Sequence, residues 1–377
     1  MLHGSSDLYG ASRIFLITAI SLKEKGHFPH VVLSESGPLT EALEKAGISV
    51  DIVRLGIVRR KYFNGPGILN RIKVMKKAVR ILGQVVDNRK ITDIYSNTAA
   101  VWVGALLAKK KKLRHYWHLH EIIVRPFWFS YLMGNIINYA ADKVIVVSGA
   151  VKDHWKKHID SKKLELVYNG IDYTPYMNPG GDLKGELAIE QEACVIGMIG
   201  RVNSWKGHEY FLEISEELNK KFLNLRFILV GDAFPGEEHL YEGLEKKILE
   251  KKFKNRVFNL GFRSDISSVL ATLDIFVLPS TLPDPFPTVI LEAMAAGKPV
   301  IATAHGGAVE MISDDETGIL IPWNSPKEAA DKMASMVADK NKRKHMGELG
   351  RKKVLENFSL TSYRENINNV FSPGSKP

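Results

Sequence analysis

One stretch of this sequence, FVLPSTLPDPFPTVILEAMAAGKPVIAT, combines two carboxylates with a predicted helix start. Asp284 and Glu292 stand eight residues apart, the first on a loop with four prolines and the second in the predicted helix. That helix is expected to begin at Thr288, a good N-cap residue, and to end before Gly297. Carboxylates accept hydrogen bonds from sugar hydroxyls, and helix N-termini attract phosphate. Because a nucleotide-sugar carries both kinds of group, the stretch predicts a site for one; the alternative is an ordinary loop with two solvated acids.

Two cations in the segment GRVNSWKG, residues 200–207, are suited to a diphosphate. The segment follows a predicted strand and precedes a predicted helix. Arg201 and Lys206 can therefore donate charge-assisted hydrogen bonds to a departing phosphate group. Two ordinary surface cations are the alternative, but a helix dipole disfavours a cation at a helix start, which favours an anionic ligand. The sequence contains no Asp-x-Asp pair to hold a metal ion, so diphosphate binding without a metal is predicted.

Two histidines stand two residues apart in the segment HLHE, at the end of another predicted strand. His118 and His120 share one face of that strand, because side chains alternate. A zinc site needs three or four ligands and no third ligand has a suitable spacing, which disfavours a metal pair. Satisfied polar residues near a sheet edge are the other alternative. The polar loop of residues 4–13, ahead of a predicted helix, can place backbone N–H groups against a phosphate.

The stretch around Asp284 resembles the acidic signature of the family-4 retaining glycosyltransferases, which have the GT-B fold and usually show PSxxEPFGxxxLEAMAxGxPVIA. Asp284 stands where glutamate is usual, which shortens its reach by one methylene, and Pro287 stands where glycine is common, which removes a backbone N–H. Residues 200–207 match the family's GRxxxxKG loop at all four fixed positions. HLHE resembles the family's HxHE loop, and Gly10 and Ala11 match its first glycine loop.

The resemblance implies a retaining sugar transfer and a role for each matching residue. His120 would contact the sugar near its anomeric carbon, and Arg201 and Lys206 would stabilise the departing nucleoside diphosphate. Asp284 would orient the sugar hydroxyls, and Glu292 would hold the ribose. The other residues implied in donor binding are Gly10, Arg263, Phe286 and Thr288, and those implied in acceptor binding are Tyr9 and His118. The donor is expected to be UDP- or GDP-linked, and no metal or cofactor is expected.

Strand-like apolar runs alternate with helical patterns along the chain, which predicts an α/β fold with parallel sheets. The expected strands are 30–34, 49–53, 93–96, 115–118, 143–147, 195–199, 226–230, 257–260, 274–278 and 299–302, and the expected helices include 11–25, 39–46, 72–88, 128–141 and 361–370. Only residues 1–3 precede the first glycine, so either the first strand is short and edge-like or the true N-terminus lies upstream.

The resemblance implies the GT-B arrangement of two Rossmann-like doubly wound domains facing across a cleft. The expected parts are an acceptor-binding domain at 1–172, a linker at 173–192, a nucleotide-sugar-binding domain at 193–357 and a C-terminal helix at about 358–377 that packs back on the first domain.

Positive charge is concentrated in the first half of the chain. Residues 1–172 hold 27 Lys and Arg against 14 Asp and Glu, whereas residues 173–377 hold 25 against 28. The basic clusters are Arg59 with Arg60 and Lys61, Lys73 with Lys76 and Lys77, and Lys109 to Lys112 with Arg114. We therefore expect an anionic partner. An anionic membrane surface or acceptor is favoured over nucleic acid, for which no binding module is recognisable; a solvated basic face is the alternative.

Composition indicates a cytoplasmic protein, peripheral at the inner face of the cell membrane. There is no signal peptide and no apolar run long enough to span a bilayer. The single cysteine, Cys194, lies in an apolar run and is expected in the core. Phe127, Trp128 and Phe129 are either an interfacial contact or core residues.

The patterns and the resemblance together predict a glycosyltransferase that moves a sugar from a nucleotide-sugar to a saccharide or lipid-linked acceptor, in cell-envelope glycan or polysaccharide synthesis. The resemblance implies that this transfer is retaining. A GT-B sugar-nucleotide epimerase would instead interconvert sugars without an acceptor. A non-catalytic nucleotide-sugar-binding protein would do no chemistry. The products formed from a panel of nucleotide-sugars distinguish the three.

Overall fold

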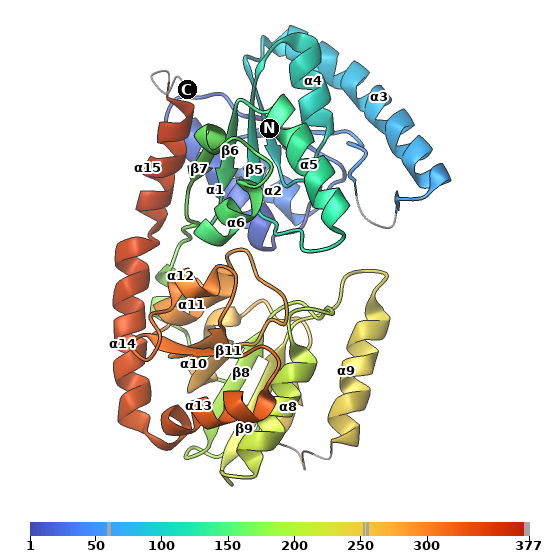
Figure 1. Cartoon of the computed structure of the whole chain (residues 1–377). Helices are drawn as coiled ribbons and strands as arrows, with labels where there is room; N and C mark the ends of the chain where they lie inside the picture. Colours follow the sequence, from blue (N-terminus) through green and yellow to red (C-terminus); the bar gives the residue numbers. More distant parts are fainter. Residues whose placement is uncertain (59–61, 252, 254–255, 373–377) are drawn as a thin grey trace. The chain divides into compact units, whose positions relative to one another are not determined.

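The computed structural model of the protein describes residues 1–58, 62–251, 253 and 256–372. The basic cluster at 59–61 and the end of the expected C-terminal segment, 373–377, lie outside the described residues. The chain forms two compact units, Met1–Ile171 with Leu360–Pro377, and Asp172–Ser359 (Figure 1). Each unit contains one parallel sheet with helices packed on it, so the expected α/β class with two Rossmann-like sheets is confirmed.

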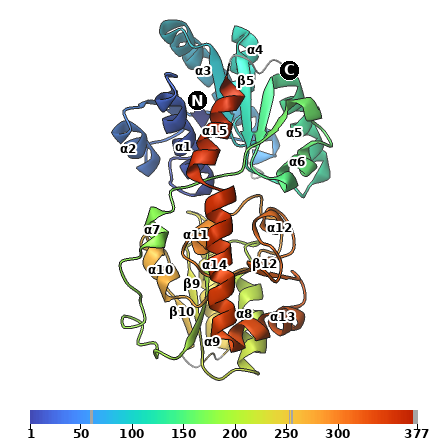
Figure 2. The same cartoon turned by 90° about the vertical axis from the view of Figure 1, so that its left-hand side faces the viewer.

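The first unit is built on a seven-stranded sheet of order β3-β2-β1-β4-β5-β6-β7, in which all neighbouring strands are parallel. Its strands are β1 Leu2–His3, β2 His30–Leu33, β3 Ser49–Ile52, β4 Asp93–Asn97, β5 Arg114–Leu119, β6 Lys143–Val146 and β7 Leu164–Leu166. Its helices are α1 Gly10–Glu24, α2 Pro38–Lys45, α3 Gly65–Arg89, α4 Val103–Lys111, α5 Phe127–Ala140, α6 Gly149–Trp155 and α15 Leu360–Phe371, and α15 packs beside α1 (Figure 2).

Strand β1 has two residues and yet lies in the middle of its sheet. Leu2 pairs with Val32 of β2 on one side and with Ser96 of β4 on the other. The expectation of a short first strand is therefore confirmed, but the expectation that it is edge-like is wrong. Two residues suffice because β2 and β4 are longer and because the Leu2 side chain is buried in a core cluster that also contains Val32.

The second unit is built on a six-stranded parallel sheet of order β10-β9-β8-β11-β12-β13. Its strands are β8 Cys194–Ile199, β9 Leu225–Val230, β10 Val257–Asn259, β11 Ile275–Leu278, β12 Val300–Thr303 and β13 Gly318–Ile321. Its helices are α7 Thr174–Met177, α8 His208–Asn219, α9 Glu238–Glu250, α10 Ile266–Thr272, α11 Thr288–Ala295, α12 Ala308–Met311, α13 Pro326–Ala338 and α14 Lys340–Asn357. Strands β8 and β11 are buried along their whole length, as expected where helices cover both faces of a parallel sheet.

The expected strands and helices are all present, most within two residues of the expected ends, with one clear exception. Helix α3 starts at Gly65 and not at residue 72, because the Asn64 side chain accepts a hydrogen bond from the Gly67 N–H at 2.8 Å and caps the helix. The glycines and the proline of its first turn have low helix propensity and hide this start. The elements that were not expected are strands β7 and β13 and helices α4, α6, α7, α9, α10, α12, α13 and α14.

The residues expected to form a linker, 173–192, are part of the second unit. They include α7, and the Leu183 N–H donates a hydrogen bond to Thr272 Oγ1 at 2.7 Å. Leu183 and Ile189 are buried. Cys194 follows and belongs to the core cluster of this unit, where burial raises the pKa of its thiol to about 12. Cys194 is therefore a core residue, as expected. Among the described residues, no helix is both long and apolar enough to cross a membrane.

Candidate functional site

In each unit the strand order reverses at one place, and candidate residues follow the strands on either side of it. The reversal lies between β1 and β4 in the first unit and between β8 and β11 in the second. Open parallel sheets bind ligands outside the carboxyl ends of their strands at such a switch point. The loop 4–9 follows β1, Asn97 ends β4, the loop 200–207 follows β8 and the loop 279–287 follows β11. The fold therefore offers one candidate site in each unit.

The loop between β8 and α8 is fixed against the loop after β11. The Thr281 N–H donates a hydrogen bond to the Trp205 carbonyl oxygen at 2.8 Å. Gly207 has a φ of 84°, and a Cβ there would lie 1.9 Å from the Pro279 carbonyl oxygen. Only glycine allows that approach, so Gly207 lets the two loops touch. This contact brings Lys206, which precedes Gly207, to the loop that carries the acidic signature.

Lys206 and Asp284 form an ion pair in the second unit, although they are 78 residues apart in sequence. Their side chains are only 15% and 10% exposed. The turn after β12 holds the Asp284 backbone, because the Gly307 N–H donates to the Asp284 carbonyl oxygen at 2.7 Å. Gly306 has a φ of 63°, and a Cβ on it would lie 2.3 Å from the same oxygen. Two predicted site residues, one cationic and one acidic, are thus brought together.

Arg201 begins the same loop and is stacked on an aromatic ring. Its guanidinium carbon lies 3.2 Å from the ring centroid of Phe234. Gly231, at the end of β9, has a φ of 144°, and a Cβ there would lie 1.9 Å from the Gly200 carbonyl oxygen. The glycine turn after β9 therefore packs directly on the backbone before Arg201. Asp232 accepts a hydrogen bond from the neighbouring Ala233 N–H at 2.7 Å and so caps this turn.

Helix α11 carries the second acid of the signature. It begins at Thr288, as expected, but the N-cap position is Pro287, which offers no side-chain hydrogen bond. Glu292 lies in its second turn and is 5% exposed. Phe286 is buried, with its ring edge-on to Phe358 at a centroid distance of 5.5 Å. The Phe286 ring is therefore used in packing, and its backbone is the part suited to a ligand.

Arg263, predicted to bind the donor, is held by carboxylates after strand β10. Its guanidinium donates to both oxygens of Asp265 at 2.8 and 2.7 Å and to Glu186 at 2.8 Å. These hydrogen bonds raise the pKa of Arg263 above its ordinary value. Because two acids already neutralise its charge, the structure gives Arg263 a role in tying residues 173–192 to the sheet.

Two further polar residues, His305 and Ser280, lie near Asp284, and His305 is not among the predicted contacts. His305, directly after β12, donates a hydrogen bond through Nε2 to the Ser280 carbonyl oxygen at 2.7 Å. Burial lowers the pKa of His305, while the nearby Asp284 carboxylate opposes that shift. The Ser280 hydroxyl is buried and has no hydrogen-bond partner among the described residues. Histidine followed by two glycines after an apolar strand is the sequence signal that could have identified His305.

In the first unit, a chain of hydrogen bonds ends on His120. Its Nε2 lies 2.9 Å from Asn97 Oδ1, and Asn97 Nδ2 lies 3.0 Å from His3 Nδ1. His3 Nε2 lies 2.9 Å from Ser12 Oγ, and Ser12 donates to Asp7 Oδ1 at 2.8 Å. The amide of Asn97 fixes the directions: its oxygen accepts from His120 and its nitrogen donates to His3. His120 therefore carries its proton on Nε2 and presents Nδ1 as an acceptor.

Burial keeps both of these histidines neutral. It lowers the pKa of His3 to about 4, and it lowers the pKa of His120 well below the ordinary value, with His118 and His3 adding to that effect. His3 and Asn97 are absent from the predicted site residues. A polar residue at the end of each of two apolar strands is the signal that could have identified them, because both positions lie at the switch point.

His118, predicted to bind the acceptor, is fully buried. Its Nδ1 lies 2.6 Å from the Tyr95 hydroxyl, and its ring centroid is 4.2 Å from that of His120. Burial lowers the pKa of His118 to about 3. The structure thus places His118 behind His120, where it supports the ring and cannot reach a molecule in solution. Among the described residues, no group of three or more His, Cys, Asp or Glu could hold a metal ion.

Glu121 follows His120 and uses its carboxylate to hold backbone. Both carboxylate oxygens accept from the Ala99 N–H at 3.1 Å, and one accepts from the His120 N–H at 3.0 Å. Burial nevertheless raises the pKa of Glu121 to about 7. Tyr9, predicted for the acceptor, is 43% exposed at the N-cap of α1, and Gly10 is the first residue of that helix. Their loop is held by Asp7, which accepts the Tyr9 N–H at 3.1 Å.

Two Rossmann-like units, with these polar groups at their switch points, constitute the GT-B glycosyltransferase fold. Solved structures agree: Anabaena Alr3699/HepE in complex with UDP and glucose is similar with a TM-score of 0.85 and 26% identity, covering 99% of this chain and 98% of that one.

Sequence models and curated relatives identify the family. The model described as Glycosyltransferase Family 4 matches residues 9–174, and the model described as Glycosyl transferases group 1 matches residues 182–353. The chain belongs to the family-4 glycosyltransferases. An uncharacterized glycosyltransferase of Methanocaldococcus jannaschii is 27% identical over 74% of this chain and 73% of its own length. The UDP-Gal:alpha-D-GlcNAc-diphosphoundecaprenol alpha-1,3-galactosyltransferase of Escherichia coli is 29% identical over 57% of this chain and 55% of its own length.

Proposed function

We propose that this protein transfers a sugar, with retention of configuration and without a metal ion, from a UDP- or GDP-linked donor to a saccharide or lipid-linked acceptor in polysaccharide or cell-envelope glycan synthesis. The observation that carries the proposal is the buried Lys206–Asp284 ion pair at the switch point of the second unit. A buried cation next to a buried acid matches the diphosphate and the sugar hydroxyls of one nucleotide-sugar. The UDP and glucose in the similar Anabaena structure support a UDP-linked donor.

The ion pair gives Lys206 a partner that a diphosphate can replace. A buried ammonium group is costly without a negative neighbour, so Asp284 stabilises Lys206 when no ligand is bound. A diphosphate also offers negative charge, with more acceptor oxygens. When it binds Lys206, the Asp284 carboxylate becomes available to accept hydrogen bonds from the sugar. Arg201, in the same loop, adds a second cation where negative charge develops on the leaving group.

The first unit provides a neutral histidine, His120, for contact with the sugar near its anomeric carbon. His120 donates from Nε2 to Asn97, which leaves Nδ1 as an acceptor for a hydroxyl group. Exposed Tyr9 is the proposed acceptor contact at the start of α1, with the backbone N–H of Gly10 for the donor diphosphate. Glu292 is proposed to hold the ribose, and its burial fits a residue that orients one fixed hydroxyl pair.

Product analysis tests the proposal against its two rivals. The protein is incubated with UDP- and GDP-sugars, with and without a saccharide acceptor and with and without EDTA, and products are identified by mass spectrometry. The expected result is acceptor-dependent transfer that survives EDTA and is lost in Arg201→Ala. An interconverted sugar without acceptor would identify an epimerase. Binding without any product would identify a non-catalytic protein, and loss of transfer in EDTA would refute metal independence.

The basic first unit is proposed to bring the protein to an anionic membrane surface at the inner face of the cell membrane. Phe127 is 75% exposed and Trp128 58%, while Phe129 is buried, so two of the three aromatics are available to an interface. Lys109 lies over the Tyr139 ring at 4.5 Å, and Lys111 is paired with Asp87 at 2.6 Å. Because Lys111 has a structural role, the other basic side chains of α4 and its C-cap are the ones to test for membrane contact.

A further inference from the structure

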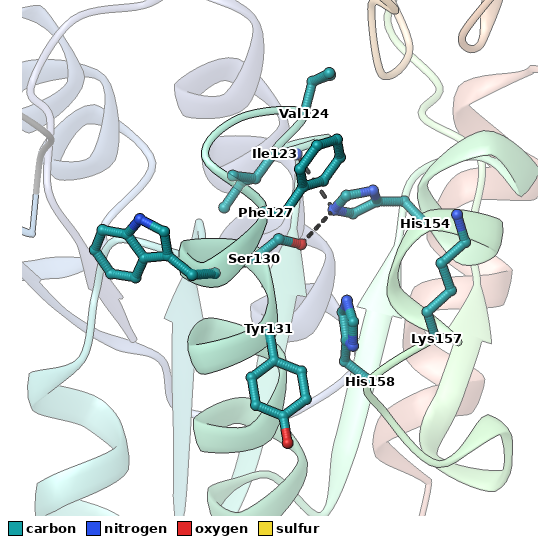
Figure 3. A pocket seen from close by; sticks show the side chains of 9 residues that line it. Ile123, Val124, Phe127, Ser130, Tyr131, His154, Lys157 and His158 are labelled. Atoms are coloured by element: carbon teal, nitrogen blue, oxygen red, sulfur yellow. Dashed lines mark hydrogen bonds between the residues drawn. The ribbon is translucent and has the colours of Figure 1, made fainter.

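A surface pocket in the first unit has no part in the site described above. It has a volume of about 570 Å³ and is formed by the loop after β5, by helix α5, and by residues at the end of α6 and just after it (Figure 3). Its lining combines aromatic side chains with basic ones. None of the described residues that line it is Asp or Glu.

One wall of the pocket is aromatic and open to water. Phe127, Trp128 and Tyr131, all from α5, are 75%, 58% and 63% exposed. Three large exposed aromatic side chains on one wall are unusual for a surface that meets only solvent, and such patches mark binding sites. The wall is held in place, because Phe63 meets Trp128 edge-on at 5.9 Å and the ring of His158 meets Tyr131 edge-on at 5.6 Å.

A second wall of the pocket presents hydrogen-bond donors and positive charge. His154 Nε2 accepts a hydrogen bond from the Ile123 N–H at 3.3 Å and lies 3.0 Å from Ser130 Oγ (Figure 3). Because a backbone N–H can only donate, Nε2 is the bare nitrogen of the neutral ring, and Nδ1 carries a proton that it can donate. Burial lowers the pKa of His154 to about 4, and Lys157 and His158 lower it further through their charge. Lys157 is exposed at this wall.

We propose that this pocket binds a phosphate group carried on an apolar chain. The phosphate would lie against Lys157, His154 and His158, and the apolar chain against Phe127, Trp128 and Tyr131. An inorganic phosphate would leave the aromatic wall in water, and an alcohol without phosphate would leave the donors and the ammonium without an acceptor. A nucleotide fits less well, because few groups of the lining could form hydrogen bonds with the edge of a base. Apart from Tyr131, the lining has one hydroxyl, that of Ser130, and it is already hydrogen-bonded to His154.

Binding of short amphiphiles to the full chain tests the pocket. Isothermal titration calorimetry compares farnesyl phosphate, below its micelle concentration, with farnesol, inorganic phosphate and uridine monophosphate. Farnesyl phosphate is expected to bind at least about tenfold more tightly than each of the others. Lys157→Ala should weaken it about tenfold, since a charge-assisted hydrogen bond is lost, and Trp128→Ala should weaken it by a similar factor.

Two matched controls lie in the same segments of the chain but do not line the pocket. Lys156 is the neighbour of Lys157 and pairs with Asp153 at 2.6 Å, and Tyr139 is an equally exposed aromatic residue of α5. Lys156→Ala and Tyr139→Ala should bind farnesyl phosphate as the parent does. Circular dichroism shows whether each variant is folded, and Lys157→Met, which nearly keeps the length of the side chain without its charge, replaces Lys157→Ala if that variant is not.

Vesicles of phosphatidylcholine with or without phosphatidate identify the source of the ligand. Binding of phosphatidate vesicles that is lost in Lys157→Ala assigns a membrane lipid, and Lys157-dependent binding of farnesyl phosphate alone assigns a free amphiphile. The proposal is overturned if farnesyl phosphate binds no better than its parts, if the Lys157 and Trp128 variants bind like the parent, or if uridine monophosphate binds most tightly. Sugar donors are absent from every arm, so failure of the proposed transfer reaction would leave this result intact.

Discussion

Removing either partner of the Lys206–Asp284 pair should destabilise the second unit about as much as removing both. Each side chain is at least 85% buried, so a single substitution leaves the other charge desolvated and unpaired. We expect Lys206→Ala and Asp284→Ala each to lower the free energy of unfolding by about 3 kcal/mol. The double variant leaves no buried charge and should lose about as much as one single variant. The coupling energy from this cycle is then about 3 kcal/mol.

Urea unfolding followed by circular dichroism measures these differences, with and without UDP. The ligand adds a second expectation that depends on the proposed site. Lys206→Ala should bind UDP about tenfold more weakly or worse, because a charge-assisted hydrogen bond is lost. In Asp284→Ala the diphosphate supplies the missing negative charge, so UDP should stabilise this variant more than it stabilises the parent. Turnover of Asp284→Ala should still fall sharply, because the sugar hydroxyls lose their acceptor.

Lys251 and Glu216 provide a matched control in the same unit. They form an ion pair at 2.5 Å, but their side chains are 25% and 38% exposed. Their coupling should be at most about 1 kcal/mol, as for surface pairs. Three results would show that Asp284 is not a partner that a diphosphate can replace. They are additive effects of the Lys206 and Asp284 substitutions, a loss of unfolding free energy no larger than in the control pair, and equal stabilisation of the parent and Asp284→Ala by UDP.

Three further expectations concern the first unit. Asn97→Ala should lower turnover at least about tenfold while UDP affinity stays at the parent value. Asn97→Asp places a carboxylate against His120 and should shift the pH–rate profile to higher pH. Unchanged profiles would show that Asn97 does not position His120. Glu121 has a pKa raised to about 7 from 4.5, so its favourable contribution to the free energy of unfolding is present below pH 4.5 and is lost as the pH rises through 7. Relative to Glu121→Gln, the parent should therefore lose up to about 3 kcal/mol of unfolding free energy over that range, measured by urea titrations. Glutamate at Lys109, Lys110 and Lys112 should release the protein from anionic vesicles in co-sedimentation without changing its urea midpoint. Retention of the variant would show that these lysines do not make the membrane contact, and absence of parent binding at low salt would leave only a soluble acceptor.

The elements of this fold follow from sequence periodicity wherever a segment is long and regular. Apolar runs such as β8 and β11 are recognisable because helices cover both faces of the sheet and every side chain of the strand must be apolar. Strand β13 is as short as β11 but lacks the long motif that accompanies β11. The start of α3 is set by a single side-chain cap at Asn64, which outweighs the poor propensity of the residues after it.

The chemical identity of the site could be predicted, but its internal contacts could not. The spacing within GRVNSWKG identifies Arg201 and Lys206 because one loop carries both. The pairing of Lys206 with Asp284 joins residues 78 apart, and that of Asn97 with His3 joins residues 94 apart. Such contacts depend on which strands become neighbours at the switch point, and local pattern does not specify that order. Burial is equally non-local, which is why His118 looks like a contact residue in the sequence and is a supporting one in the structure.

The division of the chain into units also sets the order in which they can be completed during synthesis. The first unit needs α15, which is made last: Tyr363 of that helix is buried and its hydroxyl lies 2.5 Å from that of Thr18 in α1. Phe371 stacks on Tyr116 of β5 with ring centroids 4.2 Å apart. The second unit has all its strands and helices once Ser359 has left the ribosome. The first unit therefore completes its fold after the second unit does. Until then, the apolar surface that α15 covers is exposed and prone to aggregation.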